Sequence, residues 1–165
     1  MKIRIHIDTR ENQNKHIIKA FKKHEIDYTV QKIDEGDYSI SIPEINHTCK
    51  AIIERKASLE EISANLCEPK DDNGYNRFER ELIRAKEKGI KIILLIENPN
   101  WYEDMMRHNY RTRLKPKQFR GMLFSLCSKY NVTPVGVPRE FVGSFIYNTL
   151  YYQLRDELKG MNMKI

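Results

Sequence analysis

Long apolar runs, cysteine pairs and low-complexity segments are all missing from this sequence. The longest apolar stretch, 90–96, is interrupted by Lys91 and is too short to cross a bilayer, so we expect no membrane span. The first ten residues alternate apolar with charged or polar side chains, which excludes the apolar middle of a signal peptide. The cysteines Cys49, Cys67 and Cys127 are odd in number and widely spaced, so we predict neither a disulfide framework nor a zinc site. A reducing, intracellular compartment is therefore expected.

Acidic residues are absent from one segment, between Met105 and Arg139. That segment carries a formal charge of +8, whereas the whole chain carries +6, so the remaining residues sum to −2. Tyrosine, histidine and phenylalanine side chains are interspersed among its first basic residues, a composition that suits contact with a phosphate backbone. The alternative is a basic helix face that only contacts solvent. The candidate phosphate contacts are Arg107, Arg111, Arg113, Lys115, Lys117 and Arg120.

Hydrophobic periodicity divides the chain into strands and helices. Strands are predicted at 2–8, 28–33, 37–42, 49–55, 91–96 and 132–137. Helices are predicted from Asn12 to before Asp27 and at 58–66, 75–88, 116–130 and 139–159. This order predicts an α/β fold with a mixed β-sheet flanked by helices, as a single domain over residues 1–165. The three strands between 28 and 55 are expected to form an antiparallel meander.

Carboxylates near strand ends are the strongest chemical signal. Hydrolysis of a phosphodiester needs an activated water and neutralisation of charge, which divalent cations held by carboxylates supply. Alternation along strand 49–55 places Glu54 and Lys56 on one face, so that Glu54 can bind a metal ion while Lys56 orients water. Asp37 begins a strand that we expect to pair with this one, and it can supply a second carboxylate. Taken singly, each of these features is also typical of an ordinary turn or a charged edge strand.

Several motifs in order resemble the XPF/Hef family of structure-specific nucleases. The sequence reads Asp-Thr-Arg-Glu at 8–11, then Gly-Asp at 36–37, then Glu-Arg-Lys at 54–56, which correspond to the family's successive motifs. Downstream, 73–81 is similar to a family segment that contains an arginine at the position of Arg77, and 92–97 resembles a family strand that ends in glutamate. Two departures are Glu60, where the family usually has aspartate, and Glu81, where it usually has glutamine.

The resemblance implies a restriction-endonuclease-like nuclease core and a set of site residues. Asp8, Glu11, Asp37 and Glu54 would surround Mg²⁺ or Mn²⁺, Lys56 would lie beside the attacking water, and Arg10 and Arg55 would steady the cluster. Arg77 would join the basic segment in contacting DNA. The expected activity is Mg²⁺-dependent hydrolysis of DNA at branches or at junctions of single and double strands, in the cytoplasm, nucleoid or nucleus.

Other interpretations remain open. The chain could be a non-catalytic DNA-binding subunit, although such subunits should lose the carboxylates first and all four are present here. It could also be a junction resolvase or a restriction-like endonuclease with the same metal chemistry. The resemblance implies a homodimer or heterodimer, with the last strand and terminal helix as the expected interface. The sequence contains neither the helix-hairpin-helix region nor the helicase portion that often accompanies this family, so we expect another part of the assembly to help select the substrate.

Overall fold

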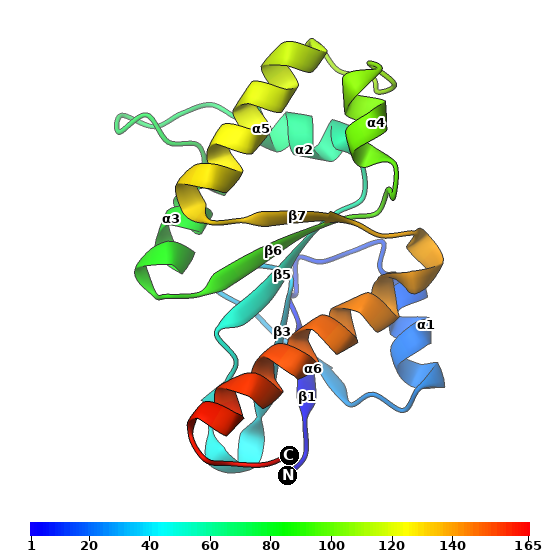
Figure 1. Cartoon of the computed structure of the whole chain (residues 1–165), viewed down its shortest axis with the longest axis vertical. Coiled ribbons are helices and arrows are strands. Elements are labelled where there is room, and N and C mark those ends of the chain that lie inside the picture. The colour runs from blue at the N-terminus through cyan, green and yellow to red at the C-terminus, as the bar shows by residue number, and fades with distance from the viewer. The chain divides into compact units, whose positions relative to one another are not determined.

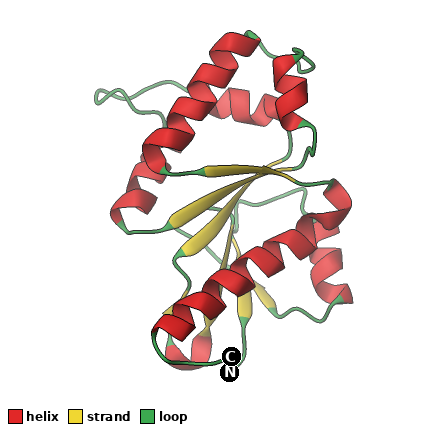
Figure 2. Ribbon diagram, viewed as in Figure 1, coloured by secondary structure: helices red, strands yellow, loops and turns green.

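The computed structural model describes all of residues 1–165. It confirms the predicted α/β fold class. A mixed seven-stranded sheet has the strand order β2-β1-β3-β5-β6-β7, with β4 paired to β3, and helices flank it (Figures 1 and 2). Contacts divide the chain into two compact units, which we describe separately. Unit 1 contains residues 1–54 and 139–165, and unit 2 contains residues 55–138. None of the helices is long and apolar enough to span a membrane.

Unit 1 is built on the first strands of the chain. Its elements are β1 (Arg4–Ile7), α1 (Lys15–Lys23), β2 (Tyr28–Val30), β3 (Tyr38–Ile42), a 3₁₀ turn (Pro43–Ile45), β4 (His47–Thr48), the first part of β5 (Ala51–Lys56), a second 3₁₀ turn (Arg139–Phe141) and α6 (Val142–Gly160). Strand β1 pairs in parallel with β2 and antiparallel with β3, and β3 pairs antiparallel with β5. The parallel pair needs a crossover, and α1 provides it.

The predicted meander is wrong in one respect. Strand β2 does not pair with β3, because β1 lies between them in the sheet. The pairing of β3 with β5, on which the argument about Asp37 and Glu54 depends, is confirmed by the register of Tyr38 opposite Ile53. Helix α6 packs on α1 so closely that a Cβ added at Gly143 would lie 2.6 Å from the Cβ of Ala20.

Unit 2 continues β5 and adds the remaining elements. These are α2 (Leu59–Leu66), α3 (Arg77–Glu87), β6 (Lys91–Ile96), α4 (Trp101–Met106), α5 (Pro116–Tyr130) and β7 (Thr133–Gly136). Ser58 and Asn76 cap α2 and α3 by accepting hydrogen bonds from Glu61 N and Glu79 N. Strands β6 and β7 pair in parallel. Helix α4 was not predicted, since it has only six residues and no side-chain cap.

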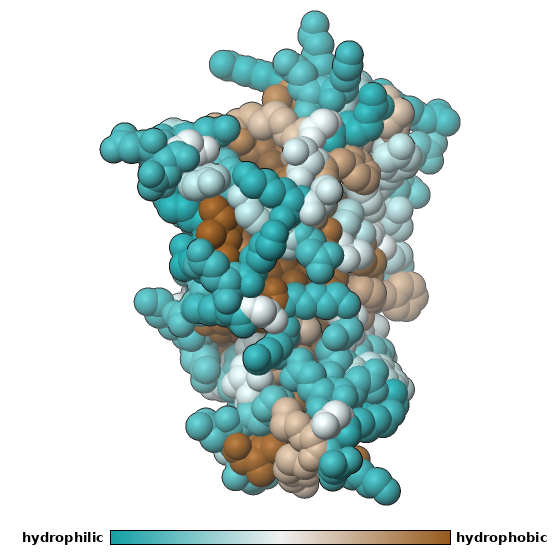
Figure 3. Space-filling view, turned by 60° about the vertical axis from the view of Figure 1, so that its left-hand side comes forward, coloured by the Kyte–Doolittle hydropathy of each residue, from teal (hydrophilic) through white to brown (hydrophobic).

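Both units bury apolar side chains at the predicted positions. In unit 1, α6 buries Ile146, Leu150, Leu154 and Leu158, which recur every four residues. In unit 2, β6 buries every residue from Ile92 to Ile96. The surface seen in Figure 3 is mainly hydrophilic, and hydrophobic side chains reach it in patches. Some large apolar side chains are exposed, and they include Tyr102 and Phe124.

Candidate active site

The three leading motifs meet through the backbone of unit 1. The Asp8 amide donates a hydrogen bond to the carbonyl of Asp37 over 2.9 Å, and the Asp37 amide donates to the carbonyl of Ile53 over 2.8 Å. Ile53 immediately precedes Glu54. The end of β1, the start of β3 and the middle of β5 are therefore joined in series: Asp8 directly follows β1, Asp37 directly precedes β3, and Glu54 lies in β5.

Gly36 allows this close approach. It has a positive φ of 77°, and a Cβ at this position would lie 2.6 Å from Ile52 Cδ1 and 3.1 Å from the carbonyl oxygen of Ile53. Both the backbone conformation and the contact with β5 thus require glycine. The Gly-Asp pair therefore has a physical basis, because glycine lets the residue that follows it, Asp37, lie against β5.

Asp8 is fully buried and accepts several hydrogen bonds. Its Oδ1 accepts from the Arg10 amide over 2.9 Å and from Arg10 Nε over 2.7 Å, and its Oδ2 accepts from the Ile33 amide over 2.7 Å. Burial alone would raise the pKa of Asp8, but the hydrogen bonds from Arg10 and Ile33 outweigh it and hold the pKa below its ordinary value of 3.8. Asp8 thus ties the loop after β1 to the loop after β2, and it orients Arg10.

Asp8→Asn is expected to destabilise the protein by about 1–3 kcal/mol at pH 7, because an amide nitrogen would face a partly buried backbone donor. Since the folded-state pKa of Asp8 is depressed, its stabilisation is present above the unfolded value and is lost as the pH falls through the folded value. The unfolding free energies of wild type and variant should therefore converge in acid. Urea titrations from pH 7 to below pH 4 measure this, and a gap that stays constant over this range would contradict it.

The side chains that were predicted to bind metal do not form a ready-made cluster. No group of three or more His, Cys, Asp or Glu side chains is arranged to hold a metal ion. Mg²⁺ usually needs only one or two protein carboxylates and completes its shell with water and substrate phosphate. Asp37 and Glu54, hard oxygen donors on neighbouring strands, fit that requirement. Glu11 lies in the loop after β1, half-buried, and its amide donates to the Asp8 carbonyl over 3.0 Å.

We call Asp8, Glu11, Asp37 and Glu54 together the acidic edge. Sequence reasoning missed one further acidic residue beside it. Glu35, in the segment between β2 and β3, is only 4 % exposed and precedes the Gly36-Asp37 pair. A buried carboxylate needs partners. The available signal was the acidic composition of the segment 34–37, which a simple hairpin turn does not require.

In unit 2, Arg55 and Lys56 have different partners. Arg55 Nη1 forms an ion pair with Glu97 Oε1 over 3.0 Å, with both side chains at 5 % exposure or less. The Glu97 amide also donates to the Lys56 carbonyl over 2.9 Å. The Lys56 ammonium lies 4.9 Å from the centroid of the Phe78 ring, on α3. Arg55 thus fixes the end of β6, and Lys56 is a buried cation two residues after Glu54.

The basic segment of unit 2 is held in place by the Glu60 carboxylate and by contacts of Tyr110. Glu60, at the position where the family usually has aspartate, accepts a hydrogen bond from the Arg111 amide over 2.8 Å, and this bond lowers the pKa of Glu60. Tyr110 donates to the carbonyl of Leu114 over 2.8 Å and packs edge-on against Phe119. These contacts anchor the loop between α4 and α5. Its predicted contact residues Arg107, Arg111, Arg113, Lys115 and Lys117 are exposed, and Arg120 is partly exposed.

Arg77 is exposed as well, but it already has an acidic partner. Its Nη2 lies 3.2 Å from Glu68 Oε1. The prediction that Arg77 contacts DNA therefore requires that this exposed ion pair be exchanged for a phosphate.

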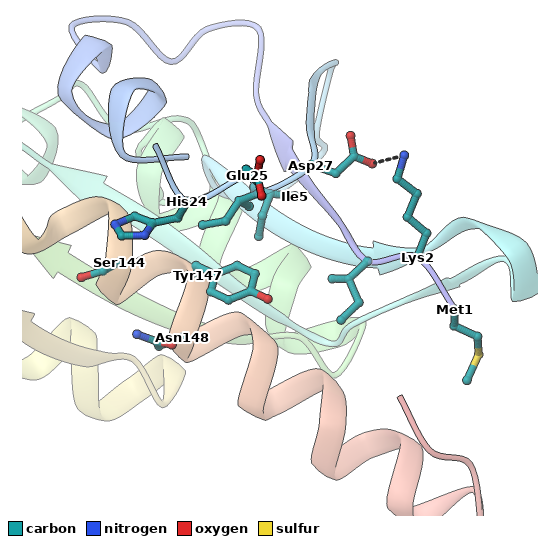
Figure 4. Close-up of a pocket in the computed structure, with 11 residues that line it drawn as sticks. Met1, Lys2, Ile5, His24, Glu25, Asp27, Ser144, Tyr147 and Asn148 are labelled. Atoms are coloured by element: carbon teal, nitrogen blue, oxygen red, sulfur yellow. Dashed lines mark ion pairs between the residues drawn. The ribbon is translucent and has the colours of Figure 1, made fainter. Parts of the chain in front are cut away.

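A separate cavity in unit 1 contains none of the predicted site residues. It encloses about 550 Å³ and is lined by residues from the start of β1, the end of α1 and α6, among them Ile5, His24 and Tyr147 (Figure 4). Lys2 and Asp27 form an ion pair of 3.6 Å at its side. The acidic edge is thus distinct from this cavity.

The chain has an α/β fold with a mixed sheet like that of the XPF nuclease domain, and it also carries the acidic edge described above. A family model of the ERCC4 domain matches residues 7–135, so the chain belongs to the ERCC4-domain family, which confirms the predicted resemblance. The fold is similar to "XPF from Aeropyrum pernix", with a TM-score of 0.64 and 16 % identity over 96 % of this chain and 68 % of that one. A second structure, of the same protein in complex with DNA, gives a TM-score of 0.63 and 15 % identity over 94 % of this chain and 66 % of that one. Among curated proteins, none matches the chain by sequence.

Proposed function

We propose that this chain is a DNA endonuclease that requires Mg²⁺ or Mn²⁺ and cuts branched DNA or DNA at junctions of single and double strands. The observation that supports it most is the series of backbone hydrogen bonds linking Asp8, Asp37 and Ile53, because it joins three family motifs at one part of the sheet. Family membership and the structural neighbour that is described in complex with DNA give further support.

The residues have distinct proposed roles. Asp37 and Glu54 would hold the cation, with Glu11 and Asp8 completing its surroundings directly or through water. The bound cation supplies neutralisation of charge on the phosphoryl group and on the departing oxygen. Lys56, on the same strand as Glu54, orients the attacking water, and Arg10, held by Asp8, steadies the acidic edge. In-line attack of water on the phosphate would leave a 5′-phosphate on the product.

Labelled flaps, forks, four-way junctions and plain duplex, incubated with Mg²⁺, with Mn²⁺ or with EDTA, test this proposal. We expect Mg²⁺-dependent cleavage of at least one branched substrate and little cleavage of plain duplex. Preferential resolution of four-way junctions, or cutting of plain duplex, would indicate one of the related nucleases instead. No cleavage of any substrate with either metal would contradict the proposal.

A non-catalytic DNA-binding subunit is the second candidate. It is favoured by the three hydrogen bonds that occupy the Asp8 carboxylate. DNA binding that is unaffected by Mg²⁺, without cleavage, would support it.

We also propose that the chain dimerises through β7 and α6. Sedimentation at micromolar concentration tests this, since a monomer would count against it.

The basic segment should contact phosphates directly. Arg111→Ala combined with Lys115→Ala is expected to weaken DNA binding and to reduce the slope of log K against log salt by about two, because each lost phosphate contact removes about one. Binding measured between low and physiological salt gives the slope. Lys19→Ala with Lys23→Ala, two exposed lysines of α1, is the matched control and should leave the slope unchanged. An identical slope for the Arg111 and Lys115 variant would remove these residues from the interface.

A further inference from the structure

Three aromatic rings gather where α4 meets α5 in unit 2. The ring centroids of Trp101 and Phe124 are 6.1 Å apart in a stacked arrangement with an interplanar angle of 29°. Tyr102 lies edge-on to both rings, 5.8 Å from Trp101 and 6.1 Å from Phe124. We call these three residues the ring cluster. It has no part in the acidic edge and is not explained by the catalytic proposal.

Two of the three rings in the ring cluster are exposed to solvent and do not belong to the buried core. Tyr102 is 49 % exposed and Phe124 is 40 % exposed, and the neighbouring Met106 is 42 % exposed. Trp101 packs tightly against the backbone of Gly136, since a Cβ added at Gly136 would lie 2.5 Å from Trp101 Cδ1. The outer two rings therefore present their surfaces to solvent on a support that packing holds in place. An exposed group of large apolar side chains of this kind usually marks a binding surface.

Basic side chains border the ring cluster. Lys117, Arg120 and Phe124 are spaced three and four residues apart on α5, so they share one helix face. The guanidinium of Arg120 lies 3.1 Å from Met106 Sδ, which places this charge beside the exposed side of α4.

The acidic residues of α4 do not oppose this positive charge. Glu103 forms an ion pair with Arg107 over 3.0 Å. Asp104 accepts hydrogen bonds from the side chains of Asn98 and Asn109, which lower its pKa and keep it paired within α4 and its flanking loops. The surface thus combines exposed rings with unopposed cations, which is complementary to a flexible polyanion that carries apolar planar groups.

We propose that the ring cluster binds single-stranded DNA, with unpaired bases stacking on Tyr102 and Phe124 and the backbone phosphates contacting Lys117 and Arg120. Base faces are available for stacking only where the strand is unpaired, so a duplex cannot use the rings in this way. A protein partner would use the apolar rings but would gain nothing from Lys117 and Arg120 unless it were itself acidic. This proposal rests on the proposed function and extends it, because it assigns the single-stranded arm of a branched substrate to α4 and α5.

The experiment measures binding without cleavage. Trp101 is the only tryptophan of the chain, so its fluorescence reports on this surface alone. Oligo(dT) of about 15 nucleotides, titrated in EDTA, should quench Trp101, and duplex of equal length should quench it far less. Phe124→Ala and Tyr102→Ala should each weaken oligo(dT) binding by about 5- to 100-fold, whereas Phe124→Tyr, which keeps a ring, should stay near wild type.

Each alternative outcome counts against the proposal. Oligo(dT) affinity that is equal in wild type and in folded Phe124→Ala and Tyr102→Ala would overturn it, as would equal quenching by duplex. If the same variants leave oligo(dT) binding unchanged but convert a dimer to a monomer in sedimentation, the ring cluster is a self-association surface instead. Because EDTA removes any contribution from the metal, these results are independent of whether the acidic edge cleaves DNA. Tyr102→Ala alters an exposed side chain, so it keeps the test decisive if Phe124→Ala fails to fold.

Discussion

Replacing Glu54 with glutamine is expected to lower Mg²⁺-dependent DNA cleavage by about 100- to 1,000-fold, because a metal ion contributes several kcal/mol of charge stabilisation to the transition state. Glutamine keeps the shape of the side chain but loses the negative charge that binds a hard cation. Glu54 lies in β5 next to the strand that begins after Asp37, so Asp37→Asn should have a comparable effect. Single-turnover cleavage of a branched substrate at saturating protein separates this effect from any loss of DNA binding.

The control for this prediction is Glu87→Gln. Glu87 ends α3 in unit 2, is exposed, and carries the same chemical change outside the acidic edge. It should cleave like wild type. Full activity of both Glu54→Gln and Asp37→Asn would refute the catalytic role of the acidic edge, and a loss that is equal in Glu87→Gln would point to a general effect of charge.

Breaking the buried ion pair of unit 2 is expected to have the largest effect on stability. Arg55 and Glu97 are joined over 3.0 Å with both side chains almost fully buried, so removal of either charge leaves the other buried without this partner. Such a loss typically costs about 3–5 kcal/mol. Arg55→Met and Glu97→Gln should each lower the free energy of unfolding by that amount in urea titrations. Replacement of both residues by methionine should recover much of the loss, since neither charge of the pair is then left buried without the other.

An exposed pair in the same unit provides the comparison. Arg77 and Glu68 are 3.2 Å apart, but the Arg77 side chain is 67 % exposed. Arg77→Met should therefore change the free energy of unfolding by less than about 1 kcal/mol. If Glu97→Gln is no more destabilising than Arg77→Met, the buried pair does not hold β5 and β6 together as we infer.

The strands and the candidate site were largely predictable from the sequence because they depend on local pattern. Alternation fixes which residues of a strand share a face, so the strands beginning at Tyr38 and Ala51 were found from their composition. The pairing of β3 with β5, and with it the proximity of Asp37 to Glu54, followed from the short connection between them. The position of β2 could not be found in this way. The crossover through α1 places β2 at the edge of the sheet, where it pairs with β1 on the side opposite β3.

Details that depend on tertiary contacts were not predictable. Nothing local shows that the Asp8 carboxylate accepts bonds from Ile33, or that the Glu60 carboxylate anchors the Arg111 amide, since each pair is far apart in sequence. The packing of Trp101 against Gly136 depends on where β7 lies, and the exposure of Tyr102 beside it depends on where α5 lies. Helix α4 was not predicted because six residues are too few to show the periodic spacing of apolar residues that indicates a helix.

Titration of the DNA-free protein with Mn²⁺, by calorimetry or by the electron paramagnetic resonance of the free ion, tests the account most directly. We predict saturable binding to wild type that is strongly weakened in Asp37→Asn and in Glu54→Gln and retained in Glu87→Gln. Equal Mn²⁺ binding by all four proteins, or none by wild type at millimolar concentration, would contradict the claim that the acidic edge holds a divalent cation.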